Sequence, residues 1–190
     1  MSCNTHWLVE GPLRAARSAL LTMALVASGT QAIASHPALP EGIASGPATL
    51  RVLGIQVYNA RLWAPAPFNP AQWDDAPVVL ELEYLRNFSG VAIADRSIVE
   101  MRRVGMFTDE QASRWTDQLR RVFPDVKSGD RIAGVHHPGR GVSFLFNDRV
   151  IGEISDAEFA RLFFAIWLGP NTSEPGMRRQ LLAQWLSGAR

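Results

Sequence analysis

The chain has 190 residues, of which 47% are hydrophobic and 19% charged, the composition of an ordinary globular protein. Its 19 basic and 18 acidic side chains nearly cancel, which argues against a nucleic-acid-binding protein, because such proteins carry a one-sided basic field. The single cysteine, Cys3, lies near the N-terminus, so the remainder of the chain has no disulfide or thiolate chemistry.

The first 34 residues have the layout of a secretory signal. Arg14 and Arg17 precede an apolar run over 19–27, and the small residues that follow predict cleavage after Ala34. The apolar run is too short to span a bilayer core of about 30 Å. An uncleaved anchor is the alternative. We therefore expect a periplasmic or secreted protein with no membrane span after cleavage.

The next segments predict strands separated by loops. Residues 35–47 are rich in Pro, Gly and Ala and predict an irregular lead-in. Residues 48–63 predict one long strand or two short ones, with Gly54 marking a bulge or tight turn. Four prolines within 65–77 predict a loop. Residues 78–85 alternate apolar and polar side chains, as in a half-buried antiparallel strand.

Start and stop signals then place four helices. A helix over 90–104 ends at Gly105, and a capping box at 108–111 opens the second helix. A further capping box at 155–158 opens the third helix, and Pro175 lies near the first turn of the fourth.

Three strands between the second and third helices form a meander, over 131–136, 142–147 and 150–154. Strands and helices are thus segregated along one domain over 48–188. This order predicts an α+β fold, an antiparallel sheet with helices packed on one face.

Arg51 and Tyr58 are polar residues inside an apolar strand pattern, and we expect both to be buried. A buried guanidinium needs a counter-charge, either a protein carboxylate such as Asp95 or an acidic ligand. Seven residues separate the two, so an unbroken strand would place them on opposite faces, whereas a bulge at Gly54 would bring them to one face. There they would hold a carboxylate or an oxyanion together.

The third helix has an apolar face that we expect to contribute to a ligand-tail pocket between the sheet and the helices, through Phe163, Ile166 and Trp167. Glu100 and Asp117 alternate with arginines and are expected on solvated helix faces or in i, i+4 pairs.

No cofactor and no metal site are predicted. The adjacent residues His136 and His137 point to opposite faces of a strand, which makes a poor chelate, and we expect them to be turn residues. Residues 139–141 are too short for a phosphate-binding loop, and no nucleophile elbow is present.

Three runs of the sequence carry a resemblance: in chain order they are LRVLGIQVYNARLWA, LELEYLRNFSGVAIADRSIVEMRRVG and GEISDAEFARLFFAIWLGPNTSEP. With them, roughly residues 42–186 resemble the exported bacterial branch of the chalcone isomerase-like family. The resemblance implies an open-faced β-sandwich with a large antiparallel sheet, helices over one face and a ligand cleft between them. The family contains plant isomerases, which close a flavanone ring by adding a phenolate oxygen to an enone, and non-catalytic relatives that bind fatty acids.

The resemblance assigns Arg51 to the arginine that both branches keep. Tyr58 falls where the isomerases have threonine and the fatty-acid binders have tyrosine. The resemblance therefore implies that the anion anchor is retained.

The catalytic set of the isomerases is not matched. The first-helix positions that hold Tyr, Lys and Asn in the enzymes correspond to Ser89, Ala92 and Arg96. The late-helix hydroxyl position falls near Ala165 or Ile166.

Three hypotheses follow. The first is a periplasmic, non-catalytic binding protein for a small amphipathic acid of fatty-acid type, held by Arg51 and Tyr58. The second is an isomerase or intramolecular lyase acting on a non-chalcone enone-type substrate, in which Arg51 stabilises an oxyanion and Tyr58 acts as the acid. The third is a structural partner protein with a closed core and no ligand. The sequence indicates no oligomeric state.

Overall fold

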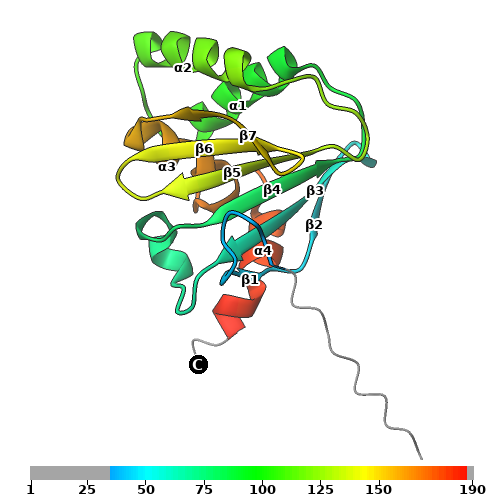
Figure 1. The fold of residues 1–190 in the computed structure, drawn as a ribbon, viewed down its shortest axis with the longest axis vertical. Coiled ribbons are helices and arrows are strands. Elements are labelled where there is room, and N and C mark those ends of the chain that lie inside the picture. The colour runs from blue at the N-terminus through cyan, green and yellow to red at the C-terminus, as the bar shows by residue number, and fades with distance from the viewer. Residues whose placement is uncertain (1–34, 188–190) are drawn as a thin grey trace, which may run out of the picture. The chain divides into compact units, whose positions relative to one another are not determined.

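A seven-stranded antiparallel sheet with helices on one face makes up the protein (Figure 1). The computed structural model describes residues 35–187, so the predicted signal over 1–34 and the last residues of the predicted domain lie outside the described part. The strand order is β1-β3-β4-β5-β6-β7, and β2 also pairs with β3. The strands are β1 (Ile43–Ala44), β2 (Ala48–Val52), β3 (Ile55–Ala64), β4 (Val79–Tyr84), β5 (Arg131–His137), β6 (Gly141–Phe146) and β7 (Arg149–Ile154).

The helices are α1 (Gly90–Val104), α2 (Asp109–Val122), α3 (Ala157–Leu168) and α4 (Pro175–Ser187). The predicted proline loop also contains a short 3-10 helix, η1 (Pro70–Asp75). This arrangement confirms the predicted α+β fold. Within residues 35–187, no helix has both the length and the apolar character needed to cross a bilayer.

Local capping signals explain where the helices begin. The Thr108 side chain accepts a hydrogen bond from the Gln111 N–H, and the Gln111 side chain bonds the Thr108 backbone, so the predicted capping box is present. Helix α3 is capped by Asp156, one residue later than the predicted box implies, because its carboxylate accepts the Phe159 N–H. Pro175 is the first residue of α4.

The main core lies between the sheet and α3. Nine residues of α3 are buried, and the Phe163 ring contacts Phe144 of β6 and Trp167 one turn along the helix. Helix α1 adds Ala94, Ile98 and Met101 to the same cluster. The alternation in β4 is as predicted, since Leu80 and Leu82 are buried against this core while Glu83 is exposed.

The opposite face of the sheet carries a smaller apolar cluster of Trp63, Val79, Ala133, Val135 and Leu145. Ala38, Leu39 and Ala44 pack on this cluster. The lead-in is therefore more ordered than the irregular segment that was predicted, with a bridge between His36 and Leu39 and the short strand β1. Apolar contact with the sheet holds it in place.

The predicted break at Gly54 is a two-residue turn between β2 and β3. Leu53 (φ 51°) and Gly54 (φ 80°) both have left-handed backbone, as such hairpin turns require. The bulge, however, lies elsewhere, because the register shifts between Leu50 and Arg51. A second register shift lies between Phe144 and Leu145, opposite the edge strand β7.

Candidate functional site

Tyr58 and Trp167, both predicted to belong to the site, meet across the sheet–helix interface. Trp167 on α3 donates its indole N–H to the Tyr58 hydroxyl oxygen on β3 at 2.9 Å. The two residues are 109 positions apart in the chain. The Tyr58 ring also contacts Tyr84 of β4 edge-on, with ring centroids 6.1 Å apart. The hydroxyl is therefore held in a defined position by α3 and two strands.

The Tyr58 hydroxyl retains a hydrogen to donate. Its oxygen accepts the bond from Trp167, and among residues 35–187 no acceptor is found for its own O–H. Burial raises the pKa of Tyr58 well above its ordinary value, although the Trp167 bond opposes this shift. The phenol thus stays neutral at physiological pH and is available as a half-buried hydrogen-bond donor.

The other two predicted pocket residues lie on α3 beside Trp167 and are buried. Phe163 and Ile166 are 6% and 7% exposed, and Phe163 packs edge-on against Trp167 with centroids 5.4 Å apart. Thr172 donates its hydroxyl to the Ile166 carbonyl and so fastens the segment after α3. The Tyr58 hydroxyl is thus bordered by apolar α3 side chains on one side, while Glu174, Glu100 and Arg96 are close enough to influence its pKa.

The prediction that Arg51 is buried is wrong. Arg51 is exposed, because β2 ends one residue later and the apolar residues around it lie at the free end of the hairpin rather than under the helices. The expected partner Asp95 instead accepts a bond from Arg120 at 3.0 Å. Arg51 follows Leu50, the cross-strand partner of Tyr58, so by strand alternation Arg51 and Tyr58 point to opposite faces and are not brought together as predicted.

Glu100 is the residue that carries a buried charge. It was predicted on a solvated helix face or in an i, i+4 pair; the pair with Arg96 is present, but Glu100 is only 6% exposed. Arg96 and Arg103 form ion pairs with its Oε1, and Ser173 donates to its Oε2 at 2.8 Å. The ion pairs keep the charge of the carboxylate compensated as it ties α1 to the segment before α4. The i, i+4 spacing to Arg96 was visible in the sequence, but the helix periodicity did not show that Ser173 would cover this side.

The positions that correspond to the catalytic groups of the isomerases have structural roles. Ser89 caps the N-terminus of α1 by accepting the Ala92 N–H at 3.2 Å. Arg96 is engaged by Glu100. At the late-helix position, Ala165 and Ile166 are buried apolar side chains.

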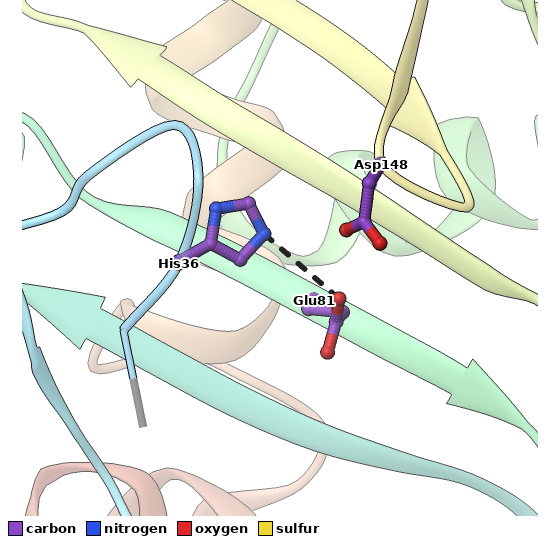
Figure 2. A group of neighbouring side chains, drawn as sticks. All are labelled: His36, Glu81 and Asp148. Carbon is purple, nitrogen blue, oxygen red and sulfur yellow. Dashed lines mark ion pairs between the residues drawn. The ribbon is translucent and has the colours of Figure 1, made fainter. Parts of the chain in front are cut away.

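His36, Glu81 and Asp148 form a second polar cluster, on the outer face of the sheet. Each offers one potential metal-ligand atom, and these three atoms lie within 4.8 Å of one another (Figure 2). The His36 ring is 2% exposed, and its Nε2 lies 3.8 Å from Glu81 Oε2. Sequence reasoning missed this cluster because His36 belongs to the lead-in.

The bonding within this cluster favours a charge-balanced network over a cation site. Arg131 already pairs with both carboxylates, with Glu81 at 3.2 Å and with Asp148 at 2.6 Å. His36 Nδ1 accepts the Ala38 N–H at 3.1 Å, which leaves the proton of the neutral ring on Nε2. A protonated nitrogen has no lone pair for a metal. The Arg131 guanidinium already supplies the positive charge that a metal ion would bring to the two carboxylates.

The buried histidines make the stability of the protein sensitive to acid. Burial lowers the pKa of His36 and of His136 below 6.5, although Asp148 and Asp74 respectively oppose the shift. Below that value these histidines bind protons in the unfolded chain but stay neutral in the folded protein. The free energy of unfolding should therefore fall as the pH drops from 7 towards 5.5. Denaturant titration across this range, compared with His36→Asn and His136→Asn, should show a shallower fall in the variants. An unchanged slope would contradict the assignment.

His137 and Ser143 form a separate polar pair, which the sequence did not indicate. His137 Nε2 lies 2.9 Å from Ser143 Oγ, in a surface depression of about 460 Å³ that Arg140 and Glu153 also line. Among residues 35–187, no carboxylate bonds the other ring nitrogen of His137, so the pair lacks the third group that orients a nucleophilic dyad. We therefore assign it to the packing of the β5–β6 hairpin.

Comparisons with known proteins agree with this architecture. A crystal structure of a fatty-acid binding protein from Arabidopsis thaliana superimposes with a TM-score of 0.57 at 14% sequence identity, over 81% of this chain and 97% of that one. At that identity the likeness shows a shared fold. An uncharacterized protein of Haemophilus influenzae is 29% identical over 113 residues, which span 60% of this chain and 55% of that protein.

The family assignment comes from the sequence itself. The model of the family described as chalcone isomerase-like matches residues 46–183, which include every strand from β2 onward and the first three helices. This agrees with the resemblance seen in the sequence and with the seven-stranded sheet. The chain belongs to the chalcone isomerase-like family.

Proposed function

We propose that this protein binds a small amphipathic carboxylic acid of fatty-acid type without catalysing a reaction. The observation that carries the proposal is the Tyr58 hydroxyl, which Trp167 orients and which has an unused hydrogen at the edge of the apolar core. A half-buried donor without an acceptor is unfavourable, and a carboxylate oxygen would satisfy it. The fold shared with a fatty-acid binding protein supports the same ligand class.

Arg51 is proposed to supply the charge at the mouth of this site. Its guanidinium lies beside a surface depression of about 400 Å³, one residue from the cross-strand partner of Tyr58. Leu50 faces Tyr58 across the strand pair, so by strand alternation Arg51 points to the other side of β2. Arg51 would attract the acid to this end of the hairpin, and the Tyr58 hydroxyl would bind the carboxylate. Because Phe163, Ile166 and Trp167 are packed in the core, the hydrocarbon tail is accommodated only when these α3 side chains move.

Several observations favour binding over isomerisation. Ser89 and Arg96, at two of the catalytic positions of the isomerases, serve as a helix cap and an ion-pair partner. Tyr58 has a raised pKa, which makes its phenol a poor proton donor near neutral pH. We also propose that the protein acts after export, in the periplasm, because the first 34 residues have the layout of a secretory signal.

The proposal is tested with a long-chain fatty acid such as oleate. Mass spectrometry of lipid extracted from the purified protein should show a bound acid, and titration with oleate should saturate at one site. Arg51→Ala is expected to weaken oleate binding roughly tenfold, the effect of losing one charge-assisted contact. Arg140→Ala, which removes an exposed arginine elsewhere, should bind as the wild type does. Absence of both extracted acid and saturable titration would refute the function.

A further inference from the structure

The β2–β3 hairpin ends in an exposed apolar tip. Leu53 in the turn is 98% exposed, and Val52 and Ile55 beside it are each 49% exposed. Turns of this left-handed type normally contain Asn-Gly or Asp-Gly, because an apolar branched side chain is disfavoured there. A leucine at this position is therefore unfavourable for both the backbone and hydration, so folding does not account for its presence.

Two guanidinium groups flank the tip. Arg51 and Arg86 line the same surface depression, and Arg86 donates its Nε–H to the Gln56 carbonyl at 3.3 Å, which fixes it at the rim. Within residues 35–187, neither arginine forms an ion pair, in contrast to Arg120 and Arg131. The hairpin thus presents an apolar end between two uncompensated positive charges.

We propose that this tip docks on an anionic phospholipid surface. Leu53, with Val52 and Ile55, would enter the boundary between headgroups and acyl chains, and Arg51 and Arg86 would contact the lipid phosphates. The inference goes beyond the proposed function, because docking requires no bound acid. It gives a role to two features that acid binding leaves unexplained, the exposed leucine and the second arginine.

The shape and charge of the hairpin favour a membrane over a protein partner. The tip lies at the right-hand end of the sheet in Figure 1, where β2 and β3 meet. A bilayer interface presents anionic headgroups above acyl chains, which is the order in which the hairpin presents cations and apolar side chains. A stable protein interface buries about 800 Å² on each partner, and a tip with three exposed apolar residues offers too little area.

The test compares variants of the full chain on vesicles of phosphatidylglycerol and of phosphatidylcholine. Leu53→Asp is expected to reduce sedimentation with phosphatidylglycerol vesicles at least tenfold, and Arg86→Glu severalfold. Met106→Asp and Arg140→Glu are the matched controls, since Met106 is 93% exposed and Arg140 is an exposed arginine elsewhere. Both controls should bind as the wild type does, and added salt should weaken wild-type binding.

A local probe separates docking by the tip from attachment through residues 1–34. In a Cys3→Ser background, an environment-sensitive fluorophore on Leu53→Cys should brighten and shift to the blue on phosphatidylglycerol vesicles, and one on Met106→Cys should not. Equal sedimentation of Leu53→Asp and Met106→Asp, or an unchanged spectrum at position 53, would overturn the inference. Oleate titration of Leu53→Asp should match the wild type, so failure of docking and failure of acid binding are distinguishable.

Discussion

Replacing Asp156 by alanine is expected to lower the free energy of unfolding by about 2–4 kcal/mol. The Asp156 carboxylate caps α3 through the Phe159 N–H and accepts the indole N–H of Trp115 at 2.9 Å. Loss of a cap costs about 1 kcal/mol, and an indole N–H left unpaired in the core costs about 1–3 kcal/mol more. Trp115 has no exposed surface in the folded protein, so its indole N–H depends on this acceptor.

Asp156→Asn separates the two contributions. Its single amide oxygen can keep the cap on the Phe159 N–H, but an NH2 group replaces the Oδ2 that accepts the Trp115 indole N–H. The asparagine variant should therefore remain more stable than the alanine variant by about 1 kcal/mol, the value of the cap that it keeps. Burial alone would raise the pKa of Asp156, but the hydrogen bonds from Phe159, Trp115 and Arg114 lower it. Its contribution is therefore present at neutral pH and is lost as the pH falls below the ordinary range of a carboxyl group. Equal denaturation midpoints for the alanine and asparagine variants would contradict this account.

Tyr58→Phe is expected to weaken oleate binding by about 10- to 100-fold, because a hydrogen bond to a charged group contributes about 1.5–3 kcal/mol. The change also leaves the Trp167 indole N–H without its acceptor, so the melting temperature should fall as well. Isothermal titration gives the first quantity and thermal denaturation the second.

Tyr84→Phe provides the matched comparison. Tyr84 is another tyrosine whose pKa is raised by burial, and its ring touches that of Tyr58. Tyr84→Phe removes a second hydroxyl but leaves the Tyr58–Trp167 bond in place. Oleate affinity should therefore change less than about threefold, which is less than the free energy of one hydrogen bond to a charged group. If both variants lose affinity equally, the effect belongs to the packing of the two rings and not to a head-group contact.

The fold was predictable because its signals are local. The alternation in β4, the capping box at Thr108 and Pro175 at the start of α4 each act over a few residues, and the structure confirms each of them. The site was only partly predictable. Trp167 and Tyr58 were both expected there, but the bond between them joins positions 109 apart, and no periodicity indicates such a contact.

The error at Arg51 has a definite physical cause. An apolar sequence pattern indicates burial only where another layer covers the strand, and the last residues of β2 extend to the end of the hairpin, where even Val52 and Ile55 are half exposed. Glu100 is the reverse case, since a helix position next to arginines is buried and bonded by Ser173, which is 73 residues away in the chain. In both cases the deciding neighbour lies outside the local pattern.

The sheet order also bears on how copies of the protein behave beside one another. Strand β7 is the last in the order, and an open edge strand can pair with a second chain and begin aggregation. Arg149 and Glu153 place charges along this strand, and the register shift between Phe144 and Leu145 twists its partner locally. These features weaken edge-to-edge pairing. The exposed Val150 on β7 is therefore an isolated apolar residue on an edge that carries charges.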